Sequence, residues 1–354
     1  MKIEFIARKN IKFALFIICL LINSPMWSQV REVKNAPSPE VANLGTFGSV
    51  PVGHYTGTPD ISVPLYTLKV GKLSIPIKAR YHLANVKPHT PPSSLGIGWT
   101  LCAGGYIARN VKGVTDEKTT SVFRPEEHRG YYYNHHKVND INESQNKPES
   151  LKHYTLLHGN DWYELSADEF TFNFCGYSGT FFMDGDGQWR VISDDNIKVE
   201  FDPKTGFRTI EDLLFRFRVH DYKKDQNKKL FNKFTLITPD GTRYTFGGYY
   251  ATEYSVPFYY QYNGELVATC WRLSRIETVD NRVIDFDYET DSYMCDIHYA
   301  PQMFLNKTKY QGQSTNAKCD LGVAGFTGFL MMPSRLVGIR SDEETITFDY
   351  HHDK

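Results

Sequence analysis

The sequence predicts an all-β protein whose strands are mostly antiparallel. Three observations lead to this prediction: apolar and polar residues alternate, Gly-rich turn motifs separate the alternating segments, and the 354 residues include 23 Tyr and 23 Phe. Aromatic side chains favour pleated, half-buried surfaces, and alternation with a period of two is typical of a strand with one buried face. We expect a strip of β-hairpins, either throughout or joined to an N-terminal module that resembles a β-sandwich.

The first 28 residues have the composition of a secretory signal peptide. Basic residues precede the ten-residue apolar run Phe13–Ile22, and a polar stretch follows it. The run is short for a transmembrane helix, which needs about 20 apolar residues. We therefore expect cleavage after Ser28 and export of the remaining chain to the extracellular space, the cell surface or the periplasm, with no membrane span.

Strands and turns are predicted in chain order from the same patterns. Apolar residues at every second position predict strands at 73–81, 170–174, 197–201 and 215–219. Runs of Asp, Pro and Gly predict turns at 184–187, 203–206 and 239–241. No stretch after the signal segment combines an apolar helical stripe with capping residues.

The segment 118–160 differs because it is polar and nearly free of aliphatic residues between Asn139 and Lys147. We expect a long surface insertion here. The chain then divides into a signal peptide (1–28), an N-terminal β module (29–117), the insertion (118–160), a β-hairpin region (161–265) and hairpin repeats (266–354).

An internal repeat occupies the C-terminal part. Trp271–Ile276 leads to Ile284–Tyr288, and Ser334–Ile339 leads to Ile346–Tyr350, with an Arg-Leu pair and an Ile-x-Phe-Asp-Tyr ending in both copies. Each copy predicts two short strands joined by a polar turn. A single hairpin cannot bury its apolar face alone, so such units stack beside one another in a longer sheet. We interpret the chain as the front part of a longer, truncated array.

Several further segments carry combinations of Gly, Pro and aromatic residues: Thr56–Tyr66, Leu73–Ile77 with Tyr81-His82, Leu95–Trp99, Ala103–Arg109 with Gly113, and Pro239–Gly248. Together with the repeat units Ile276–Tyr288 and Ile339–Tyr350, they resemble the Rhs/YD-repeat proteins of Bacteroidetes, a group related to polymorphic toxins. The resemblance covers the chain from about Pro37 onward. The motif positions for which it implies structural roles are Gly57, Pro59, Gly96, Gly98, Trp99, Gly104, Gly105, Arg109, Gly247, Gly248, Tyr288 and Tyr350.

The resemblance implies a strip of β-hairpins that winds into a large shell, which in the family often encloses a C-terminal toxin. This chain lacks the Asp-Pro-x-Gly motif that closes such a core and lacks a variable toxin tail. Self-cleavage and toxin activity are therefore not carried over.

Residues that catalyse reactions or bind metals form no recognisable pattern. Asp184 and Asp186 fit an Asp-Gly hairpin turn better than a calcium loop, because the later ligands are missing. Asp168 and Glu169 are neighbours on a predicted strand and face opposite sides. Histidines are concentrated in the polar insertion, where we interpret them as loop residues: His128, His135, His136, His153 and His158. We expect no metal, no cofactor and no catalysis, with a secreted hydrolase as the remaining enzyme alternative.

Charge and cysteine content indicate which partners and cross-links to expect. The 40 basic and 41 acidic residues form no basic stripe, so a nucleic-acid partner is not expected. Five cysteines follow the signal segment at wide spacings without a zinc-binding pair, and the shortest loop for a disulfide would join Cys295 to Cys319.

Tyrosine clusters are the remaining candidates for ligand contact. Tyr combines an apolar ring with a polar tip and can stack on sugar rings, whereas the alternative is packing along cross-strand ladders. The candidate stacking residues are Tyr131, Tyr132, Tyr133, Tyr259, Tyr260 and Tyr262, with further tyrosines at 249, 250 and 254.

Two functions follow from these observations. The first is an exported, non-catalytic structural and interaction protein, similar to the N-terminal part of an Rhs/YD shell, whose partners are further Rhs/YD segments or another copy at an open sheet edge. The alternative is a secreted β module that binds a carbohydrate or cell-surface glycan through its Tyr clusters.

Overall fold

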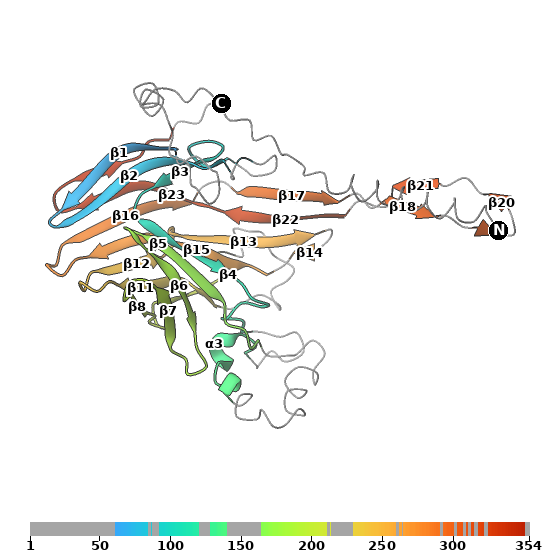
Figure 1. Cartoon of the computed structure of the whole chain (residues 1–354), viewed down its shortest axis with the longest axis horizontal. Helices are drawn as coiled ribbons and strands as arrows, with labels where there is room; N and C mark the ends of the chain where they lie inside the picture. The colour runs from blue at the N-terminus through green and yellow to red at the C-terminus, as the bar shows by residue number, and fades with distance from the viewer. Residues whose placement is uncertain are drawn as a thin grey trace, which may run out of the picture. The chain divides into compact units, whose positions relative to one another are not determined.

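The fold is all-β, as the alternation predicted. In the computed structural model (Figure 1), strands pair antiparallel and α3 (Tyr131–Asn134) is a single helical turn. The structure describes residues 61–83, 86, 92–119, 128–139, 164–210, 213, 229–259, 262–263, 265–290, 293–300, 303–306, 309–310, 313–314, 318–321 and 325–350. The predicted signal peptide and the predicted strand 215–219 lie outside these residues.

Strand β15 (Val267–Glu277) is shared by two branches of a 15-stranded sheet. Its N-terminal half pairs with β13 and β4, and its C-terminal half pairs with β12 and β16. The first branch runs β17–β22–β13–β15–β4–β5–β6–β7, and the second runs β8–β11–β12–β15–β16–β23–β24.

The other strands of the two branches have the following bounds: β4 (Gly105–Asn110), β5 (Glu169–Phe174), β6 (Tyr177–Met183), β7 (Trp189–Ser193), β8 (Lys198–Glu200), β11 (Lys233–Ile237), β12 (Arg243–Gly247), β13 (Thr252–Tyr259), β14 (Tyr262–Asn263, paired with β13), β16 (Val283–Thr290), β17 (Met294–Ala300), β22 (Gly325–Met332), β23 (Ser334–Ser341) and β24 (Thr345–Thr347). A separate pair joins β9 (Phe207–Thr209) to β10 (Lys229–Phe231).

The apolar core lies between β4–β7 and the layer of β8, β11 and β12. On β5, Phe170, Phe172 and Phe174 are buried and alternate with exposed residues, which confirms the predicted pattern. The Phe174 ring lies 4.7 Å from Tyr244 on β12. Each buried Phe contributes roughly 1.5–3 kcal/mol of hydrophobic stabilisation. Two layers of strands therefore pack face to face, as in a β-sandwich. The sequence predicted such packing for the N-terminal block, whereas here the layers come from β4–β7 and from β8, β11 and β12.

A three-stranded sheet of β1 (Ile61–Val70), β2 (Leu73–Tyr81) and β3 (Trp99–Cys102) adds to this core. Strand β2 coincides with the predicted strand 73–81. Leu68 and Ile75 are fully buried in the same apolar cluster. At the exposed end, the Tyr66 hydroxyl donates to Glu344 at 2.6 Å. The N-terminal block thus packs against the C-terminal hairpins.

The two predicted repeat copies are hairpins that lie side by side. Ile276 pairs with Ile284 between β15 and β16, and the equivalent Ile339 pairs with Ile346 between β23 and β24. Strand β16 of the first copy pairs with β23 of the second. Both predicted hairpins are therefore present in the structure.

A third hairpin, β11–β12, has the same turn as β15–β16. The Thr238 hydroxyl donates to Asp240, and the Thr278 hydroxyl donates to Asp280 at 2.5 Å. Asn281, at a φ of 61°, occupies the place of Gly241 in the other turn. The predicted turn at 239–241 is therefore present, and the two hairpins are variants of one unit.

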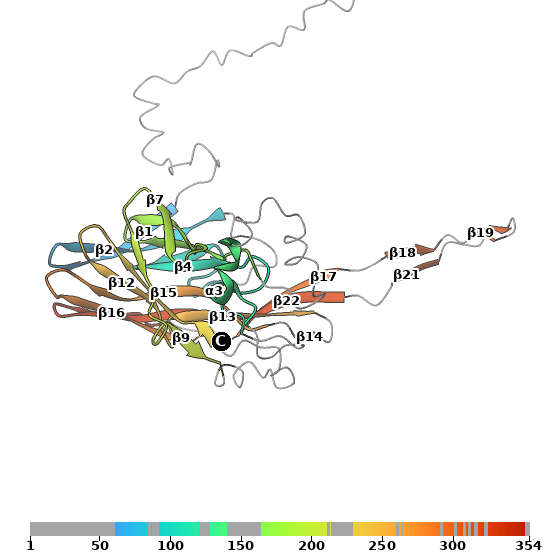
Figure 2. The ribbon, with the colours of Figure 1, turned by 90° about the horizontal axis from the view of Figure 1, so that it is seen from below.

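A long hairpin separates the two repeat copies, which the sequence patterns did not predict. Its strands pair with nearly constant register as β17–β22, β18 (Met303–Asn306) with β21 (Lys318–Leu321), and β19 (Lys309–Tyr310) with β20 (Gln313–Ser314). Figures 1 and 2 show the pairs β18–β21 and β19–β20 as separate continuations of the same hairpin. Cys295 on β17 is an exposed free thiol, so the Cys295–Cys319 disulfide is not formed.

The described parts of the segment 118–160, residues 118–119 and 128–139, are only partly exposed. Lys118, Thr119, Tyr131 and Asn134 are buried. The Lys118 carbonyl accepts hydrogen bonds from the Arg129 and Gly130 amides, which holds these two parts together. Strands from the predicted segments 29–117, 161–265 and 266–354 share one sheet, and residues 51–354 form one compact unit.

Candidate functional site: a buried arginine and carboxylate cluster

The densest group of interacting charges in the described residues surrounds Arg109 on β4. Arg109 pairs with Phe170 of β5 in the ladder, and its guanidinium carbon lies 5.5 Å from the Phe170 ring centre and 5.4 Å from that of Phe231. The side chain is fully buried. An arginine in this position requires anionic partners, because an unpaired buried charge is very costly.

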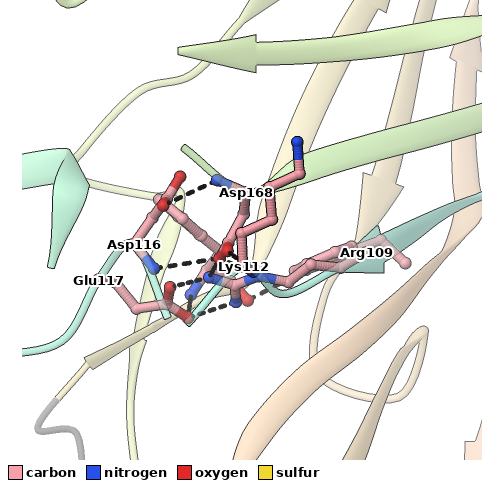
Figure 3. Close-up of polar contacts among 7 residues, drawn as sticks. Arg109, Lys112, Asp116, Glu117 and Asp168 are labelled. Carbon is pink, nitrogen blue, oxygen red and sulfur yellow. Dashed lines mark hydrogen bonds and ion pairs between the residues drawn. The ribbon is translucent and has the colours of Figure 1, made fainter. Parts of the chain in front are cut away.

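Two carboxylates supply those partners (Figure 3). The Arg109 guanidinium donates to both oxygens of Glu117, at 2.9 and 2.5 Å, and twice to Asp168 Oδ2, at 2.8 and 2.5 Å. Both carboxylates are fully buried. The bidentate geometry matches the planar fork of an arginine and would not be reproduced by a lysine.

The loop that follows β4 brings the carboxylates into place. Gly113 has a φ of 83°, and a Cβ there would meet the Glu164 carboxylate, which accepts hydrogen bonds from the Val114, Leu165 and Ser166 amides. This turn positions Asp116 and Glu117 beside Arg109. The Glu117 carboxylate also accepts from the Phe231 amide of β10 at 3.4 Å.

Asp116 and Asp168 are joined by reciprocal backbone contacts. The Asp116 amide donates to Asp168 Oδ2 at 3.1 Å, and the Asp168 amide donates to Asp116 Oδ1 at 3.0 Å. The other Asp116 oxygen, Oδ2, is buried and has no hydrogen-bond partner in the part of the chain that the structure describes. Asp116 receives no hydrogen bond from Arg109, unlike Glu117 and Asp168.

The electrostatics of the cluster follow from burial and pairing. Burial raises the pKa of Asp116 well above its usual range, and the nearby Asp168 charge adds to that shift. Burial also raises the pKa of Asp168, although the Arg109 charge opposes the shift. Burial alone would lower the pKa of Arg109, because it disfavours the charged guanidinium. The negative charges of Glu117 and Asp168 have the larger combined effect, so the pKa of Arg109 is raised. Asp116 therefore keeps its proton to a higher pH than an exposed aspartate does.

A second ion pair continues the cluster toward β15. Lys118 Nζ lies 2.5 Å from the Glu265 carboxylate, just before that strand. Burial raises the pKa of Glu265, and Lys118 opposes the shift. The cluster thus connects β4, the 111–119 loop, the start of β5, β10 and the approach to β15. Because its central side chains are fully buried, their chemistry is to join chain segments rather than to contact a dissolved substrate.

Sequence reasoning identified Arg109, through the family resemblance, and named Asp168, but it missed Asp116, Glu117 and Glu265. The run Asp116-Glu117-Lys118 looked like the start of a polar insertion. A signal was present, since three consecutive charged residues begin six positions after the end of β4, the strand that carries the inward-facing Arg109. Their burial, however, depends on contacts with β10 and α3.

The tyrosines at 131–133 do not form an exposed platform. Tyr131 is only 4% exposed, and the Tyr132 ring packs edge-on against Phe207 and Phe231, with centroids 5.3 and 5.6 Å away. Tyr133 stacks on His128 at 4.2 Å. Burial removes Tyr131 from an exposed stacking surface, and the Tyr132 ring packs on core phenylalanines. Both residues lie on the helical turn α3, so they do not form the cross-strand ladder that was the alternative.

Tyr249 and Tyr250 are among the exposed tyrosines of the described residues, at 45% and 48%. Their rings meet edge to face with centroids 4.6 Å apart. The Arg208 guanidinium lies 4.0 Å from the Tyr249 ring centre. The candidate stacking residues Tyr259, Tyr260 and Tyr262 have side chains outside the described part of the chain.

The family-motif residues that are described occupy structural positions. Gly96 and Gly98 have positive φ values before Trp99, whose ring lies 5.3 Å from that of Tyr81. Gly104 and Gly105 join β3 to β4. Gly247 and Gly248 end β12, where a Cβ on Gly247 would meet the Asn232 carbonyl oxygen. Gly57 and Pro59 lie outside the described residues.

The histidine and Asp-Gly motifs are turn and packing elements where they are described. Asp184 Oδ1 accepts from the Asp186 and Gln188 amides, at 2.9 and 2.8 Å, in the β6–β7 turn. His135 Nδ1 lies 3.0 Å from the Gly185 carbonyl oxygen. His153 and His158 lie outside the described residues. Among the described side chains, no group of three His, Cys, Asp or Glu is placed to hold a metal ion.

Comparisons with known proteins add no family assignment: no protein-family profile matches the sequence, and no curated protein matches it significantly. A search of the described helices for one long and apolar enough to cross a bilayer found none.

Proposed function

We propose that this chain is an exported, non-catalytic structural and interaction protein that resembles the N-terminal part of an Rhs/YD-repeat β-shell. Export is inferred from the basic and apolar N-terminal residues. The partner that this function requires is a further β-hairpin, from an Rhs/YD segment or another chain, which adds to an edge of the repeat sheet.

The observation that carries the proposal is a hydrogen bond that recurs in both repeat copies. The Tyr288 hydroxyl donates to the Leu273 carbonyl at 2.9 Å, and the Tyr350 hydroxyl donates to the Leu336 carbonyl at 2.8 Å. These residues hold the same positions in the two copies. Since β16 of the first copy pairs with β23 of the second, each unit presents an edge strand to which the next unit adds.

A third hairpin added to the protein tests this function. We would append a duplicate of residues 334–350 after Lys354 in the full chain. The proposal expects the added hairpin to pair with β24. The amides of Thr345 and Thr347 face away from β23, so they should exchange more slowly with deuterium, and the melting temperature should rise.

The matched control appends the same 17 residues in scrambled order, which removes the alternation and the terminal Tyr. It should leave the exchange of β24 unchanged. If the ordered duplicate also leaves β24 unprotected and itself exchanges like an unfolded peptide, the repeat-strip function is wrong.

Glycan binding is a second candidate function, and it is favoured by the exposed edge-to-face pair of Tyr249 and Tyr250. Aromatic rings with polar tips suit wet binding surfaces. Titration with soluble polysaccharides should change the aromatic fluorescence, and Tyr250→Ala should abolish the change while Tyr106→Ala, another exposed Tyr, preserves it. An unchanged response in both variants would exclude this pair as the binding surface.

A further inference from the structure

Strand β17 forms an end of the longer branch of the sheet. Met294–Ala300 pair with β22 from Met331 to Gly325 without a register shift, and β22 is the one strand paired with β17 in the described residues. The Ile297 side chain, at the middle of the strand, is 53% exposed. Among the described residues, one edge of this seven-residue strand is therefore unpaired, and its central residue is apolar.

Other edges of the described sheets carry features that discourage pairing with another chain. Strand β1 contains Pro64, a register shift beside it and the exposed Lys69, and β7 carries the exposed Arg190. Strands β8 and β24 have only three residues each. Charged side chains, Pro, bulges and short length are the usual protection of an edge. Strand β17 has no Pro, Lys or Arg and no bulge.

The sequence of β17 is complementary to itself in one antiparallel register. Along a strand, every second residue directs its backbone N–H and C=O groups toward a given edge. When two copies of one edge pair antiparallel about a two-fold axis, a residue of one copy therefore lies opposite the same residue of the other copy, at the axis. With Ile297 on the axis, all seven residues pair: Met294 opposite Ala300, Cys295 opposite Tyr299, and Asp296 opposite His298. This register places an acidic residue opposite a basic one on both sides of the axis.

We propose that β17 is a homodimerisation edge, at which two copies of this chain pair antiparallel about a two-fold axis through Ile297. Two long branches then join into one continuous sheet. This inference goes beyond the proposed function, which concerns hairpin addition at β24 and requires no second copy at β17.

Disulfide cross-linking at the axis tests the register directly. In an antiparallel pair, opposite Cα atoms are about 4.5 or 5.5 Å apart, and both values lie within the roughly 4.4–6.8 Å that a disulfide spans. In a Cys295→Ser background, Ile297→Cys should therefore form a covalent dimer under mild oxidation, seen on a non-reducing gel. The matched control is Ile192→Cys in the same background. Ile192 on the β7 edge is 66% exposed, and this variant should form no covalent dimer on the gel.

Oligomeric state provides the second measurement. Light scattering should show a dimer for the wild type and for Ile192→Lys, and a monomer for Ile297→Lys with an unchanged far-UV circular dichroism spectrum. A monomeric wild type at high protein concentration would overturn the proposal, as would equal cross-linking at positions 192 and 297. Either result leaves the hairpin-addition test at β24 unaffected, so the two proposals fail separately.

Discussion

Arg109 shows how one buried charge organises distant parts of the chain. Its two carboxylate partners come from the loop after β4 and from the start of β5, which are 8 and 59 residues away. Replacing a buried ion pair with apolar residues is often neutral for stability, whereas removing one partner is costly. We therefore expect the cluster to favour this fold over alternative folds more than to add net stability. Only a fold that brings Glu117 and Asp168 together provides the buried Arg109 guanidinium with its hydrogen-bond acceptors.

Asp116 makes the stability of the protein depend on pH. Because its pKa is raised in the folded state, the folded protein binds a proton that the unfolded chain releases near pH 4. Its stabilising contribution is complete below that pH and is lost as the pH rises through the folded-state pKa. Asp116→Asn stays neutral, so relative to the wild type it should gain stability from pH 5 to pH 8, by roughly 1–3 kcal/mol.

Urea unfolding at several pH values measures this difference. Asp202→Asn is the control, because Asp202 is an exposed turn residue whose pKa is lowered, first by the Lys204 amide. Its folded and unfolded pKa values both lie below the range tested, so its effect should be constant between pH 5 and pH 8. If Asp116→Asn also gives a constant difference, Asp116 is charged throughout and the assignment of its proton is wrong.

At the scale of single elements, hairpins were predictable because their signals are local. The alternation on β5, the turn at 239–241 and the two Ile-x-Phe-Asp-Tyr units each lie within about 20 residues, and each corresponds to an observed element. The repeated Tyr has a physical role that the pattern did not reveal: its hydroxyl satisfies a backbone carbonyl of the preceding strand.

Pairings between distant strands were not predictable from the same patterns. Strand β4 pairs with β15 across more than 150 residues, and no alternation or turn motif specifies such a partner. The burial of Asp116 and Glu117 was missed for the same reason, because it depends on segments that are distant in the sequence. Asp116 and Glu117 look like surface residues in the sequence, and they become buried only through contacts with β5, β10 and α3.

At the scale of the whole molecule, β15 couples the two branches of the sheet. Trp271 lies near the point where its partners change from β13 and β4 to β12 and β16. It is fully buried, its ring lies 5.7 Å from Phe170 on β5 and 5.2 Å from Phe234 on β11, and its Nε1 donates to the Phe231 carbonyl at 3.0 Å. One side chain thus contacts both layers of the core.

Trp271→Ala should therefore destabilise both branches together. The truncation leaves a cavity and an unsatisfied carbonyl, with an expected loss of about 3–5 kcal/mol in the free energy of unfolding. Thermal melts followed by far-UV and near-UV circular dichroism should shift to a lower temperature and remain coincident, whereas Phe329→Ala, at an exposed position on β22, should shift them far less. If near-UV signal is lost while most strand signal melts at the wild-type temperature, the branches fold independently and β15 does not couple them.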